Sequence, residues 1–334
     1  MSERPQLRKD IDTLTALVQQ TATHLGINEA FVEKDFWAIE VLRICAAGDE
    51  IVVDGEARPV SVVFKGGTSL SRVYGLIERF SEDVDILVLF PPGTGTGARG
   101  NSLKRIAMRV QEHLGLPDDS CEVVGSTKGV HRDVRYRYPR RFVSQAATEY
   151  VLLEMGSRGG PTPRQPHLVR SQVANYAIDV LGETPDEWAE FASVAIDVLS
   201  PERTLLEKLA LLHDCGTRYA ESDKARDAMA LAGRHFYDVH CLLNDTGVRD
   251  ALAELGPTGI VELAADVDAR SDAAGWSYTP RPNRGFADSA AFAEGAVSRA
   301  TAEASYSTAL GMVHGHKPTL DECLSTVHRF RELL

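Results

Sequence analysis

The chain has 334 residues, a formal net charge of −12 and 43% hydrophobic residues, which is enough for one elaborated domain or two ordinary ones with buried cores. The acidic balance argues against a protein that coats nucleic acid non-specifically. No apolar stretch approaches the ~20 residues of a membrane span, and the N-terminal residues lack the apolar run of a signal peptide. The five cysteines form no CxxC pair, so we expect reduced thiols in a cytoplasmic protein and no zinc site.

The first 200 residues alternate between helical and strand patterns. Residues 6–46 predict helices, with Asn28 as an N-cap. The patterns then predict strands at 60–65 and 83–90, near 121–125, 130–138 and 148–155, and near 167–174, and helices at 68–79 and about 102–114. Gly-rich residues 91–101 and 156–166 predict loops. The first of these lacks the lysine of a P-loop, so it is not expected to bind phosphate in that way.

From residue 200 onward, helical patterns dominate. Ser200 and Pro201 are typical of an N-cap and a first helical position, and residues 214–233 suggest a mobile connection. No internal repeat is present. The sequence therefore predicts an α+β fold, with a mixed-sheet lobe at 1–197 followed by a helical lobe at 198–334.

Two aspartates two residues apart dominate the candidate chemistry. Asp83 and Asp85 lie inside an apolar run, and alternate residues of a strand project to one face. Paired carboxylates repel unless protons or cations lie between them, and Mg²⁺ typically takes one or two carboxylates together with substrate phosphates. Upstream, a short strand ends in Gly66, Gly67, Thr68 and Ser69. Such a turn lets a phosphate approach the backbone N–H groups. Each motif alone is weak, but in this order they indicate nucleotidyl transfer.

A third carboxylate would complete a two-metal site. Glu154 follows the apolar residues 151–153, which suggests a strand end beside the strand of Asp83 and Asp85. The alternative is a solvated glutamate at a strand end. We favour the metal-ligand interpretation.

Basic residues gather in the segment 128–141, where aromatic residues are interleaved. The candidate contacts to an acceptor are Arg132, Arg135, Arg137 and Arg140. They indicate either a phosphate-contacting strip for RNA or nucleotide or a solvated edge strand that uses arginine against aggregation. The residues alone leave both open.

Three further residues have two interpretations each. Lys208 could hold a triphosphate, or be a surface lysine that pairs with Glu202 or Asp214. Asp238 could act in the site, or be an acid neutralised by a nearby base such as Arg234. Ser81, two residues before Asp83, could cap the turn into the strand, or could bind or accept phosphate.

Together these residues resemble the AbiEii/AbiGii nucleotidyltransferase toxins, the toxin halves of type IV toxin–antitoxin systems, which include the MenT-type toxins. The resemblance is carried by VEKDFW (Val32–Trp37), KGGTSLSRVYGLIERFSEDVDI (Lys65–Ile86), LEMGSR (Leu153–Arg158) with LSPERTLLEKLALLHD (Leu199–Asp214), and RHFYD (Arg234–Asp238). The blocks span residues 32–238 in the expected order. The match is specific only as an ensemble, and the last third carries no sharp motif. A polar insert at 220–233 departs from the pattern and weakens the placement of Asp238.

The resemblance implies a polymerase-β-like nucleotidyltransferase fold, a need for Mg²⁺ and consumption of an NTP. It maps Asp83 and Asp85 onto metal ligands and places Ser69 near the phosphates. Lys208 corresponds to a triphosphate-contacting lysine and Asp238 to a distal acid. Ser81 corresponds to the serine beside the catalytic acid, whose phosphorylation is one known control of such toxins.

The expected function is that of a toxin that moves a nucleotide from an NTP to the 3′ end of tRNA, as some MenT-type members do, and so blocks translation. The resemblance also implies a partner, an AbiEi-type antitoxin with a winged-helix domain. Two alternatives stay open: an enzyme that modifies protein, as AMPylating enzymes do, and a module that only senses a nucleotide. A housekeeping tRNA-processing enzyme is disfavoured, because the sequence shows no separate RNA-binding domain.

Overall fold

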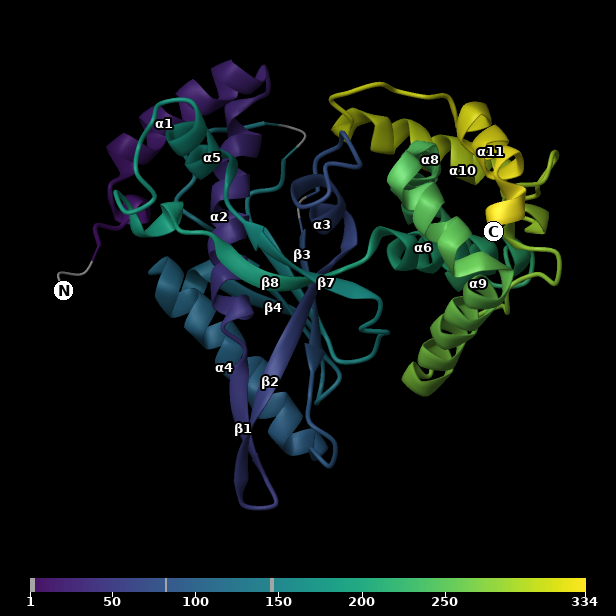
Figure 1. Ribbon diagram of the computed structural model, residues 1–334, viewed down its shortest axis with the longest axis horizontal. Coiled ribbons are helices and arrows are strands. Elements are labelled where there is room, and N and C mark those ends of the chain that lie inside the picture. Colours follow the sequence, from purple (N-terminus) through teal and green to yellow (C-terminus); the bar gives the residue numbers. More distant parts are fainter. Residues whose placement is uncertain (1–3, 82, 145–146) are drawn as a thin grey trace. The chain divides into compact units, whose positions relative to one another are not determined.

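The computed structural model describes residues 4–81, 83–144 and 147–334, and Figure 1 shows its chain path. The chain forms two compact units, and each is built from segments that are separated in the sequence. The first unit comprises Met1–Val73, Ser81–Ser157 and Arg164–Val198, and the second comprises Tyr74–Phe80, Arg158–Pro163 and Leu199–Leu334. The sequence-based domain limits placed the segments at 74–80 and 158–163 in the first lobe, whereas they cluster with the second.

A mixed sheet forms the centre of the first unit. Its strands are β1 (Asp49–Val53), β2 (Glu56–Lys65), β3 (Asp83–Leu89), β4 (Cys121–Thr127), β5 (His131–Tyr136), β6 (Val151–Gly156), β7 (Arg164–Val169) and β8 (Val194–Leu199). Their order is β4-β5-β6-β3-β2-β8-β7, with β1 paired to β2. The β3–β6 and β2–β8 pairs are parallel, whereas β2–β3, β4–β5 and β5–β6 are antiparallel.

Helices cover one face of this sheet. The first unit contains α1 (Ile11–Leu25), α2 (Glu29–Ala46), α3 (Gly66–Arg72), α4 (Thr96–Leu114) and α5 (Gln172–Asp179). Helix α2 contacts β2, β3 and β6, and α4 contacts β1 and β5. Val84, Ile86 and Leu153 are fully buried, and alternation puts their strand neighbours on the opposite face. Tyr136 marks the helix-covered face, because its hydroxyl donates to the Ala107 carbonyl of α4 at 2.9 Å. The other face is therefore the one free to carry polar side chains.

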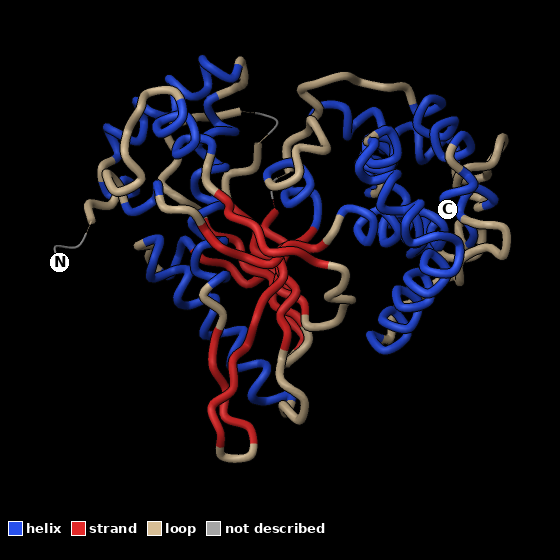
Figure 2. Tube along the Cα trace, viewed as in Figure 1, coloured by secondary structure: helices blue, strands red, loops and turns tan. Residues whose placement is uncertain are grey.

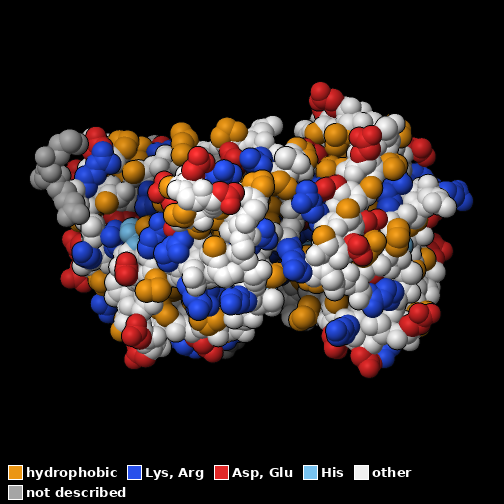
Figure 3. Space-filling view, turned by 90° about the horizontal axis from the view of Figure 1, so that it is seen from below, with side chains coloured by type: hydrophobic (Ala, Val, Ile, Leu, Met, Phe, Trp, Pro, Cys, Tyr) orange, Lys and Arg blue, Asp and Glu red, His pale blue; other side chains and the backbone are white. Residues whose placement is uncertain are grey.

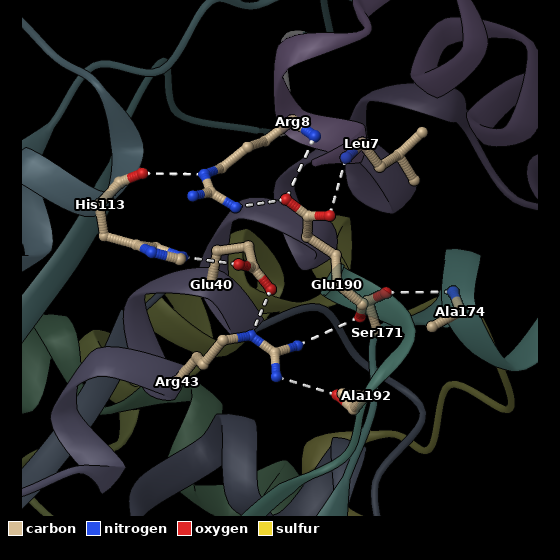
Figure 4. A network of polar contacts seen from close by, with 9 residues as sticks. All are labelled: Leu7, Arg8, Glu40, Arg43, His113, Ser171, Ala174, Glu190 and Ala192. Atoms are coloured by element: carbon tan, nitrogen blue, oxygen red, sulfur yellow. Dashed lines mark hydrogen bonds and ion pairs between the residues drawn. The ribbon is translucent and has the colours of Figure 1, made fainter. Parts of the chain in front are cut away.

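A buried polar network ties the helices to the N-terminal segment (Figure 4). Glu190 accepts from the Leu7 N–H at 2.8 Å and from Arg8 Nη1 at 2.5 Å. Glu40 of α2 contacts His113 Nε2 at 2.7 Å and accepts from Arg43 Nε at 2.9 Å. Because each buried carboxylate has cationic partners or N–H donors, the network satisfies its own charges.

The second unit is helical. Its helices are α6 (Pro201–Thr217), α7 (Asp223–Leu231), α8 (Gly233–Asn244), α9 (Thr246–Ala274), α10 (Arg299–Ala309) and α11 (Leu320–Arg329). Helix α9 is interrupted at Gly256, which has non-helical angles and precedes Pro257. Figure 2 shows this unit as helices and loops in the part of the chain that is described. Across the described residues, no helix combines the length and the apolar character that membrane passage requires.

The structure confirms the α+β class, with a mixed sheet followed by helices. It also confirms two local predictions at helix starts. Asn28 caps α2 by accepting from the Ala30 N–H, and Pro201 lies in the first turn of α6 after Ser200.

Two of the predicted helical boundaries were wrong. The helix expected at 68–79 ends at Arg72 as α3, and Gly75 adopts a φ of +64°, a left-handed angle that stops helix propagation. Residues 91–101 are not wholly a loop, because α4 starts at Thr96. Gly100 there lies against the 128–129 turn, and a Cβ at this position would be 3.3 Å from Lys128 Cγ.

Other predictions failed where short elements follow one another closely. The strand expected near 167–174 ends at Val169, and α5 follows after its N-cap Ser171. The connection expected at 214–233 contains α7, which Ser222 caps. Strands β1 and β8 were not predicted. The β1–β2 turn does carry a hairpin signal, because Asp54 and Gly55 both have positive φ and an Asp-Gly pair favours a two-residue turn of this kind.

Candidate functional site

The carboxylates identified in the sequence lie in one row across neighbouring strands. The register places Asp85 of β3 beside Glu154 of β6, and Glu154 beside Asp133 of β5. Residues opposite each other in adjacent strands project to the same face, and Asp83 shares that face two residues away. All four side chains are partly buried. This is the sheet face opposite the α2–α4 core.

The pKa of Glu154 is strongly raised in this environment. A hydrogen bond shared with Asp85 raises it to about 8, and burial and the charges of Asp85, Asp83 and Asp133 act in the same direction. The pKa of Asp133 is also raised, by burial first, with His131 opposing and Asp85 adding to the rise. Crowded carboxylates accept a proton when no cation lies between them. Glu154 is therefore not the solvated strand-end glutamate of the alternative interpretation.

The glycine turn packs directly against these acids. Gly66 has a φ of +80°, and a Cβ at this position would overlap with Asp85 Oδ2, so only glycine fits. The Thr68 hydroxyl donates to the Asp83 carbonyl, which joins α3 to the start of β3. The Ser69 hydroxyl donates to the Gly66 carbonyl at 2.9 Å and is fully buried. The turn and the carboxylates form one continuous feature of the first unit.

The chemistry of this donor set suits Mg²⁺, which prefers hard oxygen ligands and negative charge. Within residues 4–81, 83–144 and 147–334, no group of three or more His, Cys, Asp or Glu side chains is already arranged to hold a metal ion. The residues nonetheless fit a divalent cation in type and charge.

Lys208 and Asp238 belong to a buried ion cluster in the second unit. Lys208 Nζ on α6 lies 2.8 Å from Asp238 Oδ2 on α8 and 3.2 Å from His235 Nδ1. Arg79 donates from Nε to Asp238 Oδ1 at 2.6 Å and from Nη2 to Oδ2 at 2.7 Å. Lys208 is 7% exposed, so the alternative of a surface lysine that pairs with Glu202 or Asp214 is wrong.

The charges of this cluster perturb one another strongly. Burial would raise the pKa of Asp238, but Arg79 and Lys208 hold it well below its usual range. Burial lowers the pKa of Lys208, and Asp238 only partly opposes this. Burial also lowers the pKa of His235 well below its ordinary value, helped by the charge of Lys208. The cluster is therefore an ionised carboxylate between two cations, with a neutral imidazole beside it.

The four arginines proposed to contact an acceptor do not form one strip. Arg135 Nη1 and Arg137 Nη2 lie 3.7 and 3.2 Å from Glu122 Oε2, and Arg135 shares the face of the carboxylates. Arg132 is opposite Met155 and projects to the α4 side of the sheet, where it lines a cavity of about 230 Å³. Arg140 pairs with a different residue, Glu149 at 2.9 Å.

Strand alternation splits the predicted strip between two faces. Figure 3 shows that Lys and Arg side chains are interspersed with Asp and Glu on the visible face. Ser81 is partly buried at the point where the chain passes from the second unit into the first. Its role as a phosphorylated switch stays a prediction.

Sequence reasoning missed three residues of these clusters. Asp133 was not identified as a candidate, although its position opposite Glu154 follows from strand alternation once β5 and β6 are aligned. Arg79 was assigned to a helix that in fact ends at Arg72. His235 precedes Asp238 by three residues and so shares its helix face, a spacing that could have drawn attention to it.

Neighbouring carboxylates beside a glycine turn, on the open face of a mixed sheet, are suited to holding a cation and a phosphate. This is the chemistry of phosphoryl- and nucleotidyl-transferring enzymes. A sequence model of one family, described as "Nucleotidyl transferase AbiEii toxin, Type IV TA system", matches residues 57–334. The chain belongs to this family of nucleotidyltransferase toxins, as the sequence blocks had suggested. A toxin of this type implies an antitoxin partner.

A comparison with solved structures found MenT4, a nucleotidyltransferase toxin from Mycobacterium tuberculosis H37Rv. It is 18% identical, with a TM-score of 0.39, over 95% of this chain and 96% of that chain. A TM-score of this size does not establish a shared fold, so the family assignment rests on the sequence match. A search of curated proteins found no match.

Proposed function

We propose that the protein is a Mg²⁺-dependent toxin that transfers a nucleotide from an NTP to the 3′ end of a tRNA and thereby blocks translation. The observation that supports this most directly is the row of carboxylates Asp85, Glu154 and Asp133, with Asp83 on the same face and the Gly66 turn against Asp85. Repulsion between four carboxylates on one sheet face destabilises a fold unless a cation binds there. Membership of a nucleotidyltransferase family names the reaction class.

Asp83, Asp85 and Glu154 would hold the metal ion. When bound, Mg²⁺ supplies positive charge against the phosphoryl oxygens and the leaving group. Binding requires Glu154 to give up the proton that it shares with Asp85, so affinity rises with pH until Glu154 is ionised. Asp133, opposite Glu154, adds negative charge to the same face and is the weaker candidate as a ligand.

Backbone and cationic groups of the chain would hold the NTP. The turn from Gly66 to Ser69, through Gly67 and Thr68, offers N–H groups without side-chain obstruction at Gly66. Lys208 supplies positive charge for the triphosphate. Arg135, on the carboxylate face, is the best placed of the predicted arginines to contact an acceptor phosphate, since Arg132 projects to the opposite face. Nucleotidyl transfer then depends on positioning and on charge stabilisation more than on covalent help.

Two parts of the proposal concern control. The antitoxin partner would be an AbiEi-type protein with a winged-helix domain. Phosphorylation of Ser81 would place a dianion two residues from Asp83, where it repels both the acids and an incoming triphosphate. A Ser81→Asp protein that transfers nucleotide as fast as the unmodified protein would contradict this form of control, and Ser81→Ala serves as its control.

The experiment is a transfer assay with each NTP labelled at the α-phosphorus, mixed with purified enzyme, Mg²⁺, total RNA and total protein. We expect label in RNA of tRNA size, and its loss in Asp83→Ala but not in the control Asp12→Ala, which changes an exposed aspartate in α1. Label confined to an RNase-resistant protein band would instead establish a protein-modifying enzyme. An Asp83→Ala variant that keeps full transfer activity and toxicity would disprove the mechanism.

A further inference from the structure

Lys208 has a fixed number of hydrogen-bond donors, and two are already engaged. A lysine ammonium carries three N–H donors. Among the described residues, Asp238 Oδ2 lies 2.8 Å and His235 Nδ1 3.2 Å from Nζ. These two contacts hold the nitrogen on a side chain that is only 7% exposed. One donor is left for a ligand.

Both carboxylate oxygens of Asp238 already have hydrogen-bond or ion-pair partners. Arg79 binds Oδ1 through Nε and Oδ2 through Nη2, and Lys208 shares Oδ2. The side chain is 0% exposed. A carboxylate in this position cannot reach a metal ion or a substrate without breaking a bidentate, fully desolvated ion pair, which costs several kcal/mol. Its negative charge opposes the lowering of the Lys208 pKa by burial.

His235 acts as an acceptor in this cluster. Burial and the nearby cations keep its ring neutral, and a neutral imidazole carries a free lone pair on one nitrogen. Here that nitrogen is Nδ1, which faces Lys208 Nζ. The ring thus fixes the direction of the ammonium group, which Asp238 alone would leave free to rotate.

We propose that Arg79, Asp238 and His235 are positioning residues that hold Lys208 with one N–H directed to a phosphate oxygen of the bound nucleotide. The proposal rests on the nucleotide-binding role of Lys208 in the proposed function. It gives Asp238 a different role from the catalytic acid expected from the sequence, and it adds two residues that the sequence did not identify. Arg79 also fixes the end of the segment Tyr74–Phe80, after which the chain continues through Ser81 into β3.

The test compares two substitutions of His235. His235→Asn keeps an acceptor oxygen near the position of Nδ1, whereas His235→Leu removes it. We expect His235→Leu to raise the KM for NTP about tenfold, as the loss of one hydrogen bond to a charged group implies, with kcat changed less than about threefold. His235→Asn should stay within about threefold of the unchanged protein in both.

A second comparison combines His235→Leu with Lys208→Ala in a double-mutant cycle. If His235 acts through Lys208, His235→Leu should add little to the defect of Lys208→Ala, because the two changes remove one interaction. Additive effects, or a His235→Leu variant with unchanged KM, would overturn the proposal.

A second measurement separates this proposal from the proposed function. The rate at which Lys208 reacts with an amine-specific reagent, read by mass spectrometry, needs no catalytic activity. We expect His235→Leu and Asp238→Asn to change that rate at Lys208 and to leave Lys9 labelling unchanged. If the unchanged protein transfers no nucleotide but the labelling rate shifts, the proposed function fails and the positioning cluster stands. If neither substitution changes the labelling rate, the cluster is refuted, whatever the activity.

Discussion

Replacing Arg79 with methionine should destabilise the second unit by about 3–5 kcal/mol, the range for breaking one side of a buried ion pair. Arg79 and Asp238 are 2% and 0% exposed, so water cannot replace the lost donors. The substitution keeps an unbranched side chain of similar length but removes both N–H···O contacts, of 2.6 and 2.7 Å. Asp238 Oδ1 loses the donor that Arg79 provides, and Lys208 remains as a cationic partner on Oδ2.

An exposed arginine pair gives the matched control. Arg58 and Glu56 lie 3.3 Å apart in the β1–β2 hairpin, with side chains 40% and 73% exposed. Exposed pairs contribute about 0–1 kcal/mol. Arg58→Met should therefore change stability by about 1 kcal/mol at most, although the chemical change is the same. Arg79→Lys, which keeps the charge but loses the bidentate geometry, should fall between the two.

The assay must report on the second unit alone, because two compact units need not unfold together. Hydrogen exchange of peptides from α8, followed by mass spectrometry, gives the free energy of opening for that helix. We expect a loss of about 3–5 kcal/mol in Arg79→Met there, with little change in peptides of the sheet. A loss below about 1 kcal/mol, or one equal to that of Arg58→Met, would refute the reasoning that the buried pair holds this cluster together.

Two further outcomes follow from the perturbed acids and bases. Glu154→Gln keeps a hydrogen-bonding partner for Asp85 but removes an ionisable oxygen. We therefore expect the rate of nucleotide transfer to fall at least a hundredfold, and the rise in melting temperature on adding Mg²⁺ to become smaller. An unchanged Mg²⁺ response would contradict a metal role for Glu154. The pKa of His235 is lowered in the folded state, so its contribution to stability is present above the unfolded value of 6.5 and is lost as pH falls below it. Opening of α8 should thus become easier below about pH 6.5. This pH dependence should be weaker in His235→Asn. Some of it should remain, because burial also lowers the pKa of His213.

Local patterns were sufficient to place the first candidate site but not the second. Asp83 and Asp85 could be assigned to one face because a strand has a period of two residues, and the Gly66 turn follows a recognisable strand end. Asp133 also follows from alternation, but only once β5 is aligned with β6, a pairing that the sequence does not state. The Arg79–Asp238 contact joins residues 159 positions apart, so no periodicity could reveal it.

Wrong boundaries arose where tertiary contacts override propensity. Residues after Arg72 have the composition of a helix, yet α3 ends at Arg72, Gly75 adopts a left-handed φ, and the chain reaches a buried ion pair at Arg79. The gain from satisfying Asp238 outweighs the weak preference for continuing α3, because helix propensities differ by less than about 1 kcal/mol per residue. The same reasoning explains why the polar segment 214–233 forms α7, which packs against α6 and α10.

Asp238 and Glu154 are both shielded from solvent, but their neighbours shift the two pKa values in opposite directions. Asp238 is paired with Arg79 and Lys208, and its pKa lies well below the usual range. Glu154 has acidic neighbours, and its pKa rises to about 8 because it must share a proton with Asp85. A proton can be exchanged for a metal ion, whereas the bidentate contact with Arg79 cannot be exchanged without leaving a buried charge unpaired. We therefore infer that metal-dependent chemistry belongs to Asp83, Asp85 and Glu154, and that Asp238 contributes by holding the cation that binds the nucleotide.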